Sequence, residues 1–163
     1  MTNCESFYPI IDANSKVLIL GSMPGIKSLN EQQYYAHPQN RFWKLMGQIC
    51  NIDNLQDLSY KNKLQVLLNN EFALWDVIKF CKRKGSLDSN IQNEVPNNIE
   101  TLLNKYKNIQ IICLNGNKAY KAFKKHFPKL LEKYKCYKMP STSPANARYN
   151  LEKLYNEWSK FKD

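Results

Sequence analysis

Four short apolar segments along the chain are typical of buried strands. Residues 16–21 (KVLILG) form an apolar run that ends at a glycine, which is typical of a strand covered on both faces. Residues 71–77 and 109–114 have the same character, and residues 135–139 form a weaker fourth candidate. We therefore expect four strands, separated along the chain by longer segments.

Helical spacing of apolar residues fills the intervals between these segments. Asn40 is a candidate cap for a helix whose apolar residues run from Phe42 to Ile49. Further helices are expected over residues 55–68, 98–106, 116–127 and 148–161. Strands that alternate with helices predict an α/β fold, a three-layer α/β/α sandwich around a mostly parallel four-stranded sheet. The polar residues 80–96 are expected to be irregular.

The length and the charge narrow the class of protein. A chain of 163 residues predicts a single domain over residues 1–163. No apolar run is long enough for a membrane helix, and the first residues do not resemble a signal peptide, so we expect a cytoplasmic protein without a membrane partner. We also expect it to be a monomer. The net charge of +10 favours a polyanionic partner such as nucleic acid or an anionic membrane surface. Most of the basic residues are Lys, a bias that an AT-rich genome also produces, so charge alone decides nothing.

The cysteines give no positive indication of a metal or a disulfide framework. The chain has five, an odd number, and none of them forms a C-x-x-C pair. An iron–sulfur or zinc site built from distant cysteines stays open as an alternative, but the spacing does not support one. We expect free thiols and no cofactor.

The unusual residues lie in the loops that follow the four expected strands. In open α/β sheets, ligands bind beyond the carboxyl ends of the strands, so these loops are the expected site. The segments are GSMPG (21–25) with YYAHPQNRFW (34–43), LWDV (74–77) with SLDS (86–89), LNGNKA (114–119), and PSTSPANA (140–147).

Together these segments resemble the uracil-DNA glycosylase superfamily, and within it most of all the hypoxanthine-DNA (deoxyinosine) glycosylase family. The resemblance spans residues 17–154. It implies a parallel four-stranded sheet between helices and an enzyme that removes a deaminated base from DNA by cleaving its N-glycosidic bond, which leaves an abasic site. It implies no metal and no cofactor. Some members elsewhere in the superfamily carry an iron–sulfur cluster, but the Cys positions here do not look like theirs.

The resemblance also assigns residues to the reaction. Tyr35 matches the aromatic residue that stacks on the flipped base, which is the favoured role, with a loop anchor for the core as the structural alternative. Met23 departs from the mismatch-specific relatives, whose Asn at this position orients the attacking water, a task that a thioether cannot perform. Asn40 is then the candidate to position the water, with helix capping as the alternative. The backbone N–H groups of Ser22 and Met23 are candidate donors to the leaving base.

Two polar residues are candidates to contact the base edge. Asp76 stands where uracil-specific relatives keep an Asn, and an ionised carboxylate would accept from the N1–H group of hypoxanthine. A protonated Asp76 could instead donate to O6, and a cap or an ion pair with Lys79 is the structural alternative. Asn115 is a weaker candidate for contact with the base or the water, against a simple helix cap.

DNA-backbone contacts are expected mainly in the fourth loop. Ser141 and Ser143 are suited to phosphate contacts. Ala145 and Asn146 stand where relatives often insert a Leu into the base stack, so any wedge formed there is small, and single-stranded or easily opened sites would be favoured. Arg41 and Arg148 are further phosphate candidates, with solvated charge as the alternative, and His37 is a candidate near the sugar or a part of the loop structure.

Four functions remain to be distinguished at this stage. Removal of hypoxanthine is the first choice, and removal of uracil, including mismatch-specific removal, is the second. A non-catalytic module that binds damaged DNA is a third, although such a module needs neither Asn40 nor Asp76. A nucleotide-binding α/β protein ranks last, because the chain has neither G-x-G-x-x-G nor a P-loop Lys.

Overall fold

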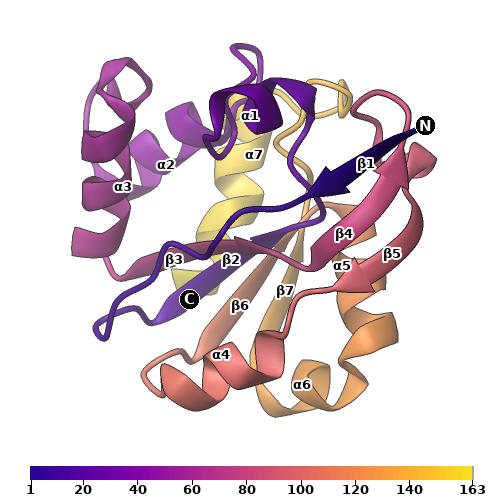
Figure 1. The fold of residues 1–163 in the computed structure, drawn as a ribbon. Coiled ribbons are helices and arrows are strands. Elements are labelled where there is room, and N and C mark those ends of the chain that lie inside the picture. Colours follow the sequence, from indigo (N-terminus) through magenta and orange to yellow (C-terminus); the bar gives the residue numbers. More distant parts are fainter. Residues whose placement is uncertain (163) are drawn as a thin grey trace.

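The central sheet confirms the predicted fold class. In a computed structural model that describes residues 1–162, four strands lie in the order β3-β2-β6-β7, and each neighbouring pair is parallel (Figure 1). The strands are β2 (Val17–Gly21), β3 (Phe72–Asp76), β6 (Ile111–Asn115) and β7 (Lys135–Met139). Their carboxyl ends meet at one edge, so the four loops selected above converge there.

Helices cover both faces of this sheet and bury its apolar side chains. Leu18 and Leu20 pack on one side with the helices α4 (Ile99–Lys105), α5 (Asn117–His126) and α6 (Pro128–Lys133). Val17 and Ile19 pack on the other with the helices α2 (Phe42–Cys50), α3 (Tyr60–Asn69) and α7 (Leu151–Trp158). Side chains alternate between the faces of a strand, so the run of residues 17–21 feeds two cores.

Several helices differ in their bounds from the prediction. Residues 55–68 form two elements, the 3-10 helix η1 (Leu55–Asp57) and α3, because the hydroxyl of Ser59 accepts from Asn62 N at 3.3 Å and caps a new helix. The last helix begins at Leu151 behind the cap residue Asn150, so Arg148 lies outside it. The short helix α1 (Ile26–Glu31) lies inside the long first loop, and η3 (Ser159–Lys162) follows α7.

The prediction that residues 80–96 are irregular is wrong. A second, antiparallel sheet has the order β1-β4-β5, with strands β1 (Thr2–Glu5), β4 (Ile78–Arg83) and β5 (Gln92–Pro96), and the 3-10 helix η2 (Asp88–Asn90) lies between the last two (Figure 1). The strands are polar because much of this sheet is exposed, and only a few of its residues, such as Cys4, Ile78 and Cys81, are buried. This sheet carries the segment 84–91 to the carboxyl-terminal edge of the main sheet.

Candidate active site

A cavity of about 1310 Å³ opens at the carboxyl ends of the parallel strands. It is lined by the end of β2, the first loop, the segment 86–89, the start of α5 and the fourth loop. All predicted site residues except Arg41 lie along it, namely Ser22, Met23, Tyr35, Asn40, Asp76, Asn115, Ser141, Ser143, Ala145, Asn146 and Arg148. Residues far apart in the sequence are therefore gathered around one space.

The Tyr35 ring is held rigidly on one side of the cavity. It stacks on Phe42 with ring centroids 3.9 Å apart and an interplanar angle of 19°. The residues on either side of it are anchored, since Tyr34 N donates to the Tyr60 hydroxyl at 3.0 Å and Ala36 N donates to Ser28 Oγ at 3.0 Å. Tyr35 itself has φ = 55°, in the left-handed region that a bulky residue rarely adopts. One face of the ring is covered by Phe42, so only the opposite face remains to stack on a ligand.

The Asn40 amide lies at the start of α2 and has a structural contact. Phe42 N, the first N–H group of α2, donates to Asn40 Oδ1 at 2.9 Å, but the N-cap residue is Arg41, so the amide supports the start of the helix from one position before the cap that the sequence predicted for it. A carbonyl oxygen has two lone pairs, and this contact occupies one of them. The same oxygen can therefore accept from a water molecule in the cavity, which leaves both predicted roles open.

The Asp76 carboxyl is the most perturbed acid of the site. It is 4 % exposed, and its Oδ2 has no hydrogen-bond partner among residues 1–162. Burial and, to a smaller extent, the negative charge of Asp88 raise the pKa of Asp76 to about 7, against the opposing charge of Arg83. A buried acid of this kind is frequent at functional sites, because its proton is exchangeable near neutral pH.

Asn115 ties three parts of the cavity wall together. Its Nδ2 donates to the Tyr35 hydroxyl at 3.2 Å and to Thr142 Oγ1 at 3.1 Å, and Thr142 N donates back to its Oδ1 at 3.1 Å. The side chain thereby fixes the Tyr35 hydroxyl and the fourth loop relative to β6. A direct contact between Asn115 and a base stays a prediction.

The fourth loop is held by its own hydroxyl groups. Ser143 N donates to Ser141 Oγ at 3.1 Å, and Ala145 N donates to Ser143 Oγ at 3.2 Å. Each serine accepts through its oxygen, so its hydroxyl hydrogen can still be donated outward to a phosphate. Asn146 Nδ2 donates to Ser141 O at 3.0 Å and closes the turn.

Arg41 does not line the cavity, and its half-buried guanidinium binds carbonyl groups of the fourth loop and of Tyr149. Its Nη2 donates to Ser143 O at 2.7 Å and to Asn146 O at 3.1 Å, and Nη1 and Nε donate to the carbonyls of Tyr149 and Thr142. Guanidinium has five N–H donors, and these contacts engage most of them. The structure therefore gives Arg41 a role in holding the fourth loop, while Arg148 is exposed and remains a phosphate candidate.

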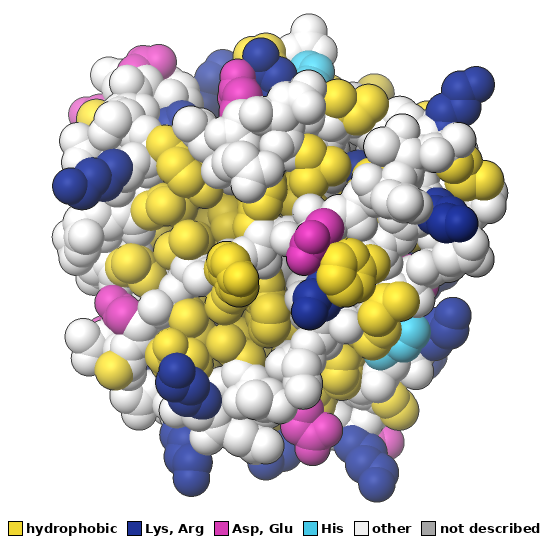
Figure 2. Space-filling view, viewed as in Figure 1, with side chains coloured by type: hydrophobic (Ala, Val, Ile, Leu, Met, Phe, Trp, Pro, Cys, Tyr) yellow, Lys and Arg dark blue, Asp and Glu magenta, His cyan; other side chains and the backbone are white. Residues whose placement is uncertain are grey.

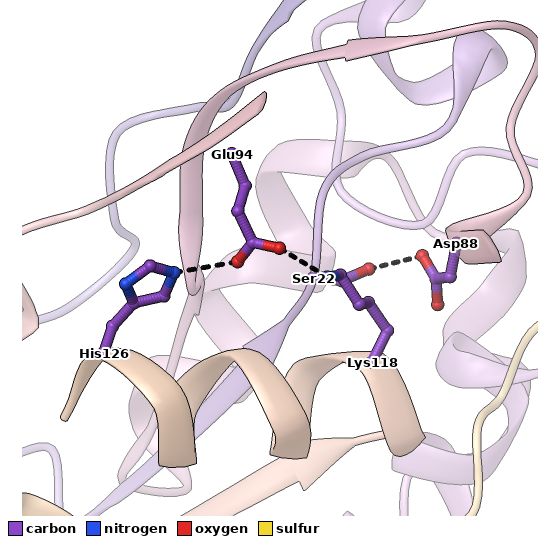
Figure 3. A network of polar contacts seen from close by, with 5 residues as sticks. All are labelled: Ser22, Asp88, Glu94, Lys118 and His126. Carbon is purple, nitrogen blue, oxygen red and sulfur yellow. Dashed lines mark hydrogen bonds and ion pairs between the residues drawn. The ribbon is translucent and has the colours of Figure 1, made fainter. Parts of the chain in front are cut away.

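A buried polar group beneath the first loop was not predicted from the sequence. Ser22 Oγ donates to Asp88 Oδ1 at 2.6 Å (Figure 3), and burial raises the pKa of Asp88 despite this hydrogen bond and the charge of Arg83. Arg83 is 1 % exposed and donates to Pro24 O, and its Nε and Nη1 have no partner within residues 1–162. Asp88 lies in the SLDS segment, which is one of the motifs that carry the family resemblance, so the sequence did point to this position. Nothing in the sequence points to Arg83, because it lies between two Lys residues and resembles an ordinary surface charge.

A second group of charges, drawn together with Asp88 in Figure 3, is centred on Glu94. Glu94 accepts from Lys118 at the start of α5, and it lies 2.8 Å from His126 Nε2 at the end of the same helix. Burial raises the pKa of Glu94, but the hydrogen bonds from Lys118 and His126 outweigh it, and the net shift is downward. Lys118 also lines the cavity, so it brings a positive charge to the rim.

Metal ligation has no support in the described residues. Among residues 1–162, no group of three or more His, Cys, Asp or Glu side chains is placed to hold a metal ion, and the five cysteines are free thiols.

No helix within residues 1–162 has the length and apolar character needed to cross a membrane.

The fold and the site define a class of protein, an α/β/α sandwich whose strand ends place an aromatic ring, an amide and a carboxyl group around one cavity. Residues 8–162 match the uracil DNA glycosylase superfamily. The chain belongs to this superfamily.

Individual relatives are also similar along most of the chain. A hypoxanthine DNA glycosylase of Methanosarcina acetivorans is 39% identical over 156 residues, which cover 94% of each chain. A hypoxanthine DNA glycosylase of Methanosarcina barkeri is 43% identical over 115 residues, which cover 71% of this chain and 72% of the relative. A solution NMR structure from Methanosarcina acetivorans, described as a candidate uracil DNA glycosylase, superposes with a TM-score of 0.83 at 34% identity and covers 99% of this chain and all of the other.

Proposed function

We propose that this protein is a monofunctional DNA glycosylase that hydrolyses the N-glycosidic bond of a flipped deaminated base, most of all hypoxanthine, and leaves an abasic site. The observation that carries the proposal is the meeting of Tyr35, Asn40 and Asp76 at one cavity. The family membership and the names of the two Methanosarcina relatives support the same activity. A binding module would need no residue that positions water.

Base capture begins outside the duplex, because the glycosidic bond of a stacked base is not accessible. The extruded base enters the cavity and stacks on the free face of Tyr35, an interaction worth roughly 1–3 kcal/mol. The Asp76 carboxylate, which lines the cavity, accepts from N1–H of hypoxanthine, and a small rotation of the carboxyl group brings its unpartnered oxygen to the base. Adenine has no hydrogen on N1 and would leave that oxygen unpaired, so this contact favours the deaminated base.

The hydrolysis itself depends on positioning and on charge. Asn40 Oδ1 accepts from a water molecule and directs it at the sugar carbon, while Phe42 N fixes the amide. Negative charge develops on the departing base, and the N–H groups of Ser22 and Met23 are the proposed donors that stabilise it. The oxygen of the water bonds to the sugar carbon as the glycosidic bond breaks, and the proton that the water releases neutralises the base anion. The Met23 side chain is 6 % exposed and packs in the core, so it takes no part in positioning water.

The basic side chains of the protein are the proposed contacts to the DNA backbone. Lys and Arg side chains project at many points around the margin of the face shown in Figure 2. At the cavity itself, the lining includes the basic residues Lys27, Lys118, Lys121, Lys138, Arg148 and Lys153. Such charge gives salt-dependent affinity without sequence preference. Ser141, Ser143 and Arg148 are the proposed phosphate contacts at the cavity, next to Ala145 and Asn146 at the tip of the fourth loop.

Uracil is the second candidate substrate. Its edge also presents an N–H group beside a carbonyl, and the similar NMR structure is described as a candidate uracil DNA glycosylase. The cavity volume is large enough for the purine as well as the pyrimidine. The same contacts therefore support both bases, and the names of the two Methanosarcina relatives favour hypoxanthine as the first choice.

The test uses oligonucleotides that each carry one hypoxanthine, uracil, xanthine or adenine residue, in duplex and in single-strand form. After incubation with the purified protein, alkali cleaves any abasic site, and the products are separated by length. We expect cleavage at hypoxanthine and none at adenine. Cleavage at uracil alone would overturn the choice of base, and tight binding without cleavage would favour the non-catalytic module.

A further inference from the structure

Two large apolar side chains are exposed at the rim of the cavity. Leu87 is 53 % exposed and Ile26 is 49 % exposed, and both line the cavity. Exposed apolar side chains beside a binding site are frequently contact residues, because solvent exposure gives them no stability. Within residues 1–162, neither side chain belongs to either of the two hydrophobic cores.

The segment that carries Leu87 is held on both sides. Before it, Ser86 Oγ accepts from Ile26 N at 2.9 Å, and after it, Asp88 accepts from the Ser22 hydroxyl at 2.6 Å (Figure 3). Asn90 N also donates to Leu87 O at 3.1 Å. An exposed leucine between two anchored residues loses little further backbone freedom when it makes a contact.

The fourth loop offers no comparable side chain. Its tip carries Pro144, Ala145 and Ala147, which are exposed but short or cyclic. Extrusion of a base leaves a gap in the stack, and unstacking costs a few kcal/mol per step unless an apolar group fills the gap. In this chain the large apolar group at the rim comes from the segment after β4 instead.

We propose that Leu87 is the wedge that enters the base stack when a nucleotide is flipped into the cavity, with Ile26 beside the same gap. This inference rests on the proposed function, since it requires a flipped base. The flanking charges fit a DNA backbone, because Lys84 is exposed in the same segment and Lys27 follows Ile26 on α1.

A single-strand substrate has no neighbouring pairs to unstack, so the wedge matters only for duplex DNA. We therefore expect Leu87→Ala to lower kcat/KM on duplex substrate about tenfold and to leave kcat/KM on the same single strand unchanged. Leu87→Met, which keeps an apolar side chain of similar length, restores duplex activity. Leu58→Ala is the matched control, since Leu58 is 36 % exposed and lies outside the cavity.

The outcomes separate this inference from the proposed function. An equal loss on both substrates would make Leu87 part of the base pocket and overturn the wedge, and unchanged duplex activity would overturn it as well. Thermal unfolding of Leu87→Ala is expected to match that of the unaltered protein, because the side chain is exposed. If the unaltered protein releases no base from either substrate, the proposed function fails instead.

Discussion

Gly21 and Asp76 are partners in the parallel register of β2 and β3, and the carboxyl group of Asp76 lies against the Cα of Gly21. A Cβ at position 21 would lie 2.6 Å from Asp76 Oδ1 and 3.2 Å from the Tyr35 hydroxyl. The absence of a side chain at Gly21 therefore creates the space in which the acid and the hydroxyl lie together. Asp76 Oδ1 and the Tyr35 hydroxyl oxygen thus both border the space left at Gly21, and all three residues line the proposed base pocket.

Gly21→Ala is expected to displace the Asp76 carboxyl and lower glycosylase activity at least about tenfold. The new methyl group would be too close to Oδ1, and both residues are buried in adjacent strands, so one of them must shift. Stability should fall by about 1–3 kcal/mol, the usual cost of overpacking. Activity assays on hypoxanthine oligonucleotides and urea unfolding measure the two effects.

The control is Gly25→Ala in the same loop. A Cβ there would lie 3.2 Å from Ser86 Oγ, a wider separation than the 2.6 Å at position 21, and the φ of −71° at Gly25 is one that alanine adopts freely. We expect this variant to keep most of its activity. Equal losses at positions 21 and 25 would indicate a general sensitivity of the loop and contradict the specific contact between Gly21 and Asp76.

The ionisation of Asp76 makes stability depend on pH. Its pKa is about 7 in the folded protein and 3.8 for the free side chain, so the folded state retains a proton that the unfolded state has lost. The contribution of Asp76 to the free energy of unfolding is therefore largest below about pH 4. It decreases as the pH rises and reaches its lowest value above about pH 7.

Asp76→Asn removes this titration while keeping the shape of the side chain. The free energy of unfolding of the variant should rise relative to that of the unaltered protein by up to about 1.4 kcal/mol for each pH unit within that range. Urea unfolding at a series of pH values measures the difference. Parallel curves would show that Asp76 does not titrate in this range.

The main sheet and its loops could be predicted because local patterns encode them. The run at residues 17–21 is apolar because the strand is covered on both faces, and a strand of that kind leaves a plain signal. The β1-β4-β5 sheet escaped prediction because it is partly exposed, so β5 alternates weakly and reads as a polar loop.

Individual roles were harder to predict than their positions. Arg41 and Arg83 carry the same side chain as Arg148, and nothing in their neighbours indicates that Arg41 binds the fourth loop or that Arg83 is buried. Such roles depend on contacts between residues about sixty to one hundred positions apart, such as those from Arg83 to Pro24 and from Arg41 to Ser143. The pattern of residues over a short stretch of sequence contains no information about such long-range contacts.

Asn40 can be tested for its two roles separately. Asn40→Ser keeps a side-chain oxygen that can accept from Phe42 N, but its shorter hydroxyl cannot hold a water molecule in the same place. We expect about a hundredfold loss of kcat with little change in the thermal midpoint. Asn40→Ala should lose activity and about 1 kcal/mol of stability as well. If the Ser variant stays active, capping alone explains Asn40.

Arg41→Lys is expected to loosen the fourth loop. A lysine cannot reproduce a guanidinium that donates to several carbonyls at once, so some of the carbonyls of residues 142–149 lose their partner. Stability should fall by about 1–3 kcal/mol, and activity should fall on duplex and single-strand substrates alike. An unchanged thermal midpoint together with weaker, salt-dependent DNA binding would instead indicate that Arg41 contacts phosphate.

Arg148→Gln tests the phosphate contact at the exposed end of the same loop. Removal of one charge that neutralises one phosphate should lower the slope of log affinity against log salt by about 0.9 for duplex DNA. Lys129→Gln is the matched control, because it removes the same charge from α6, which precedes β7 and so lies at the amino ends of the strands, away from the cavity. Neither change should alter the thermal midpoint, since both side chains are exposed. If the two variants have the same slope, Arg148 contributes only general charge, and the track of the DNA backbone must run along another part of the rim.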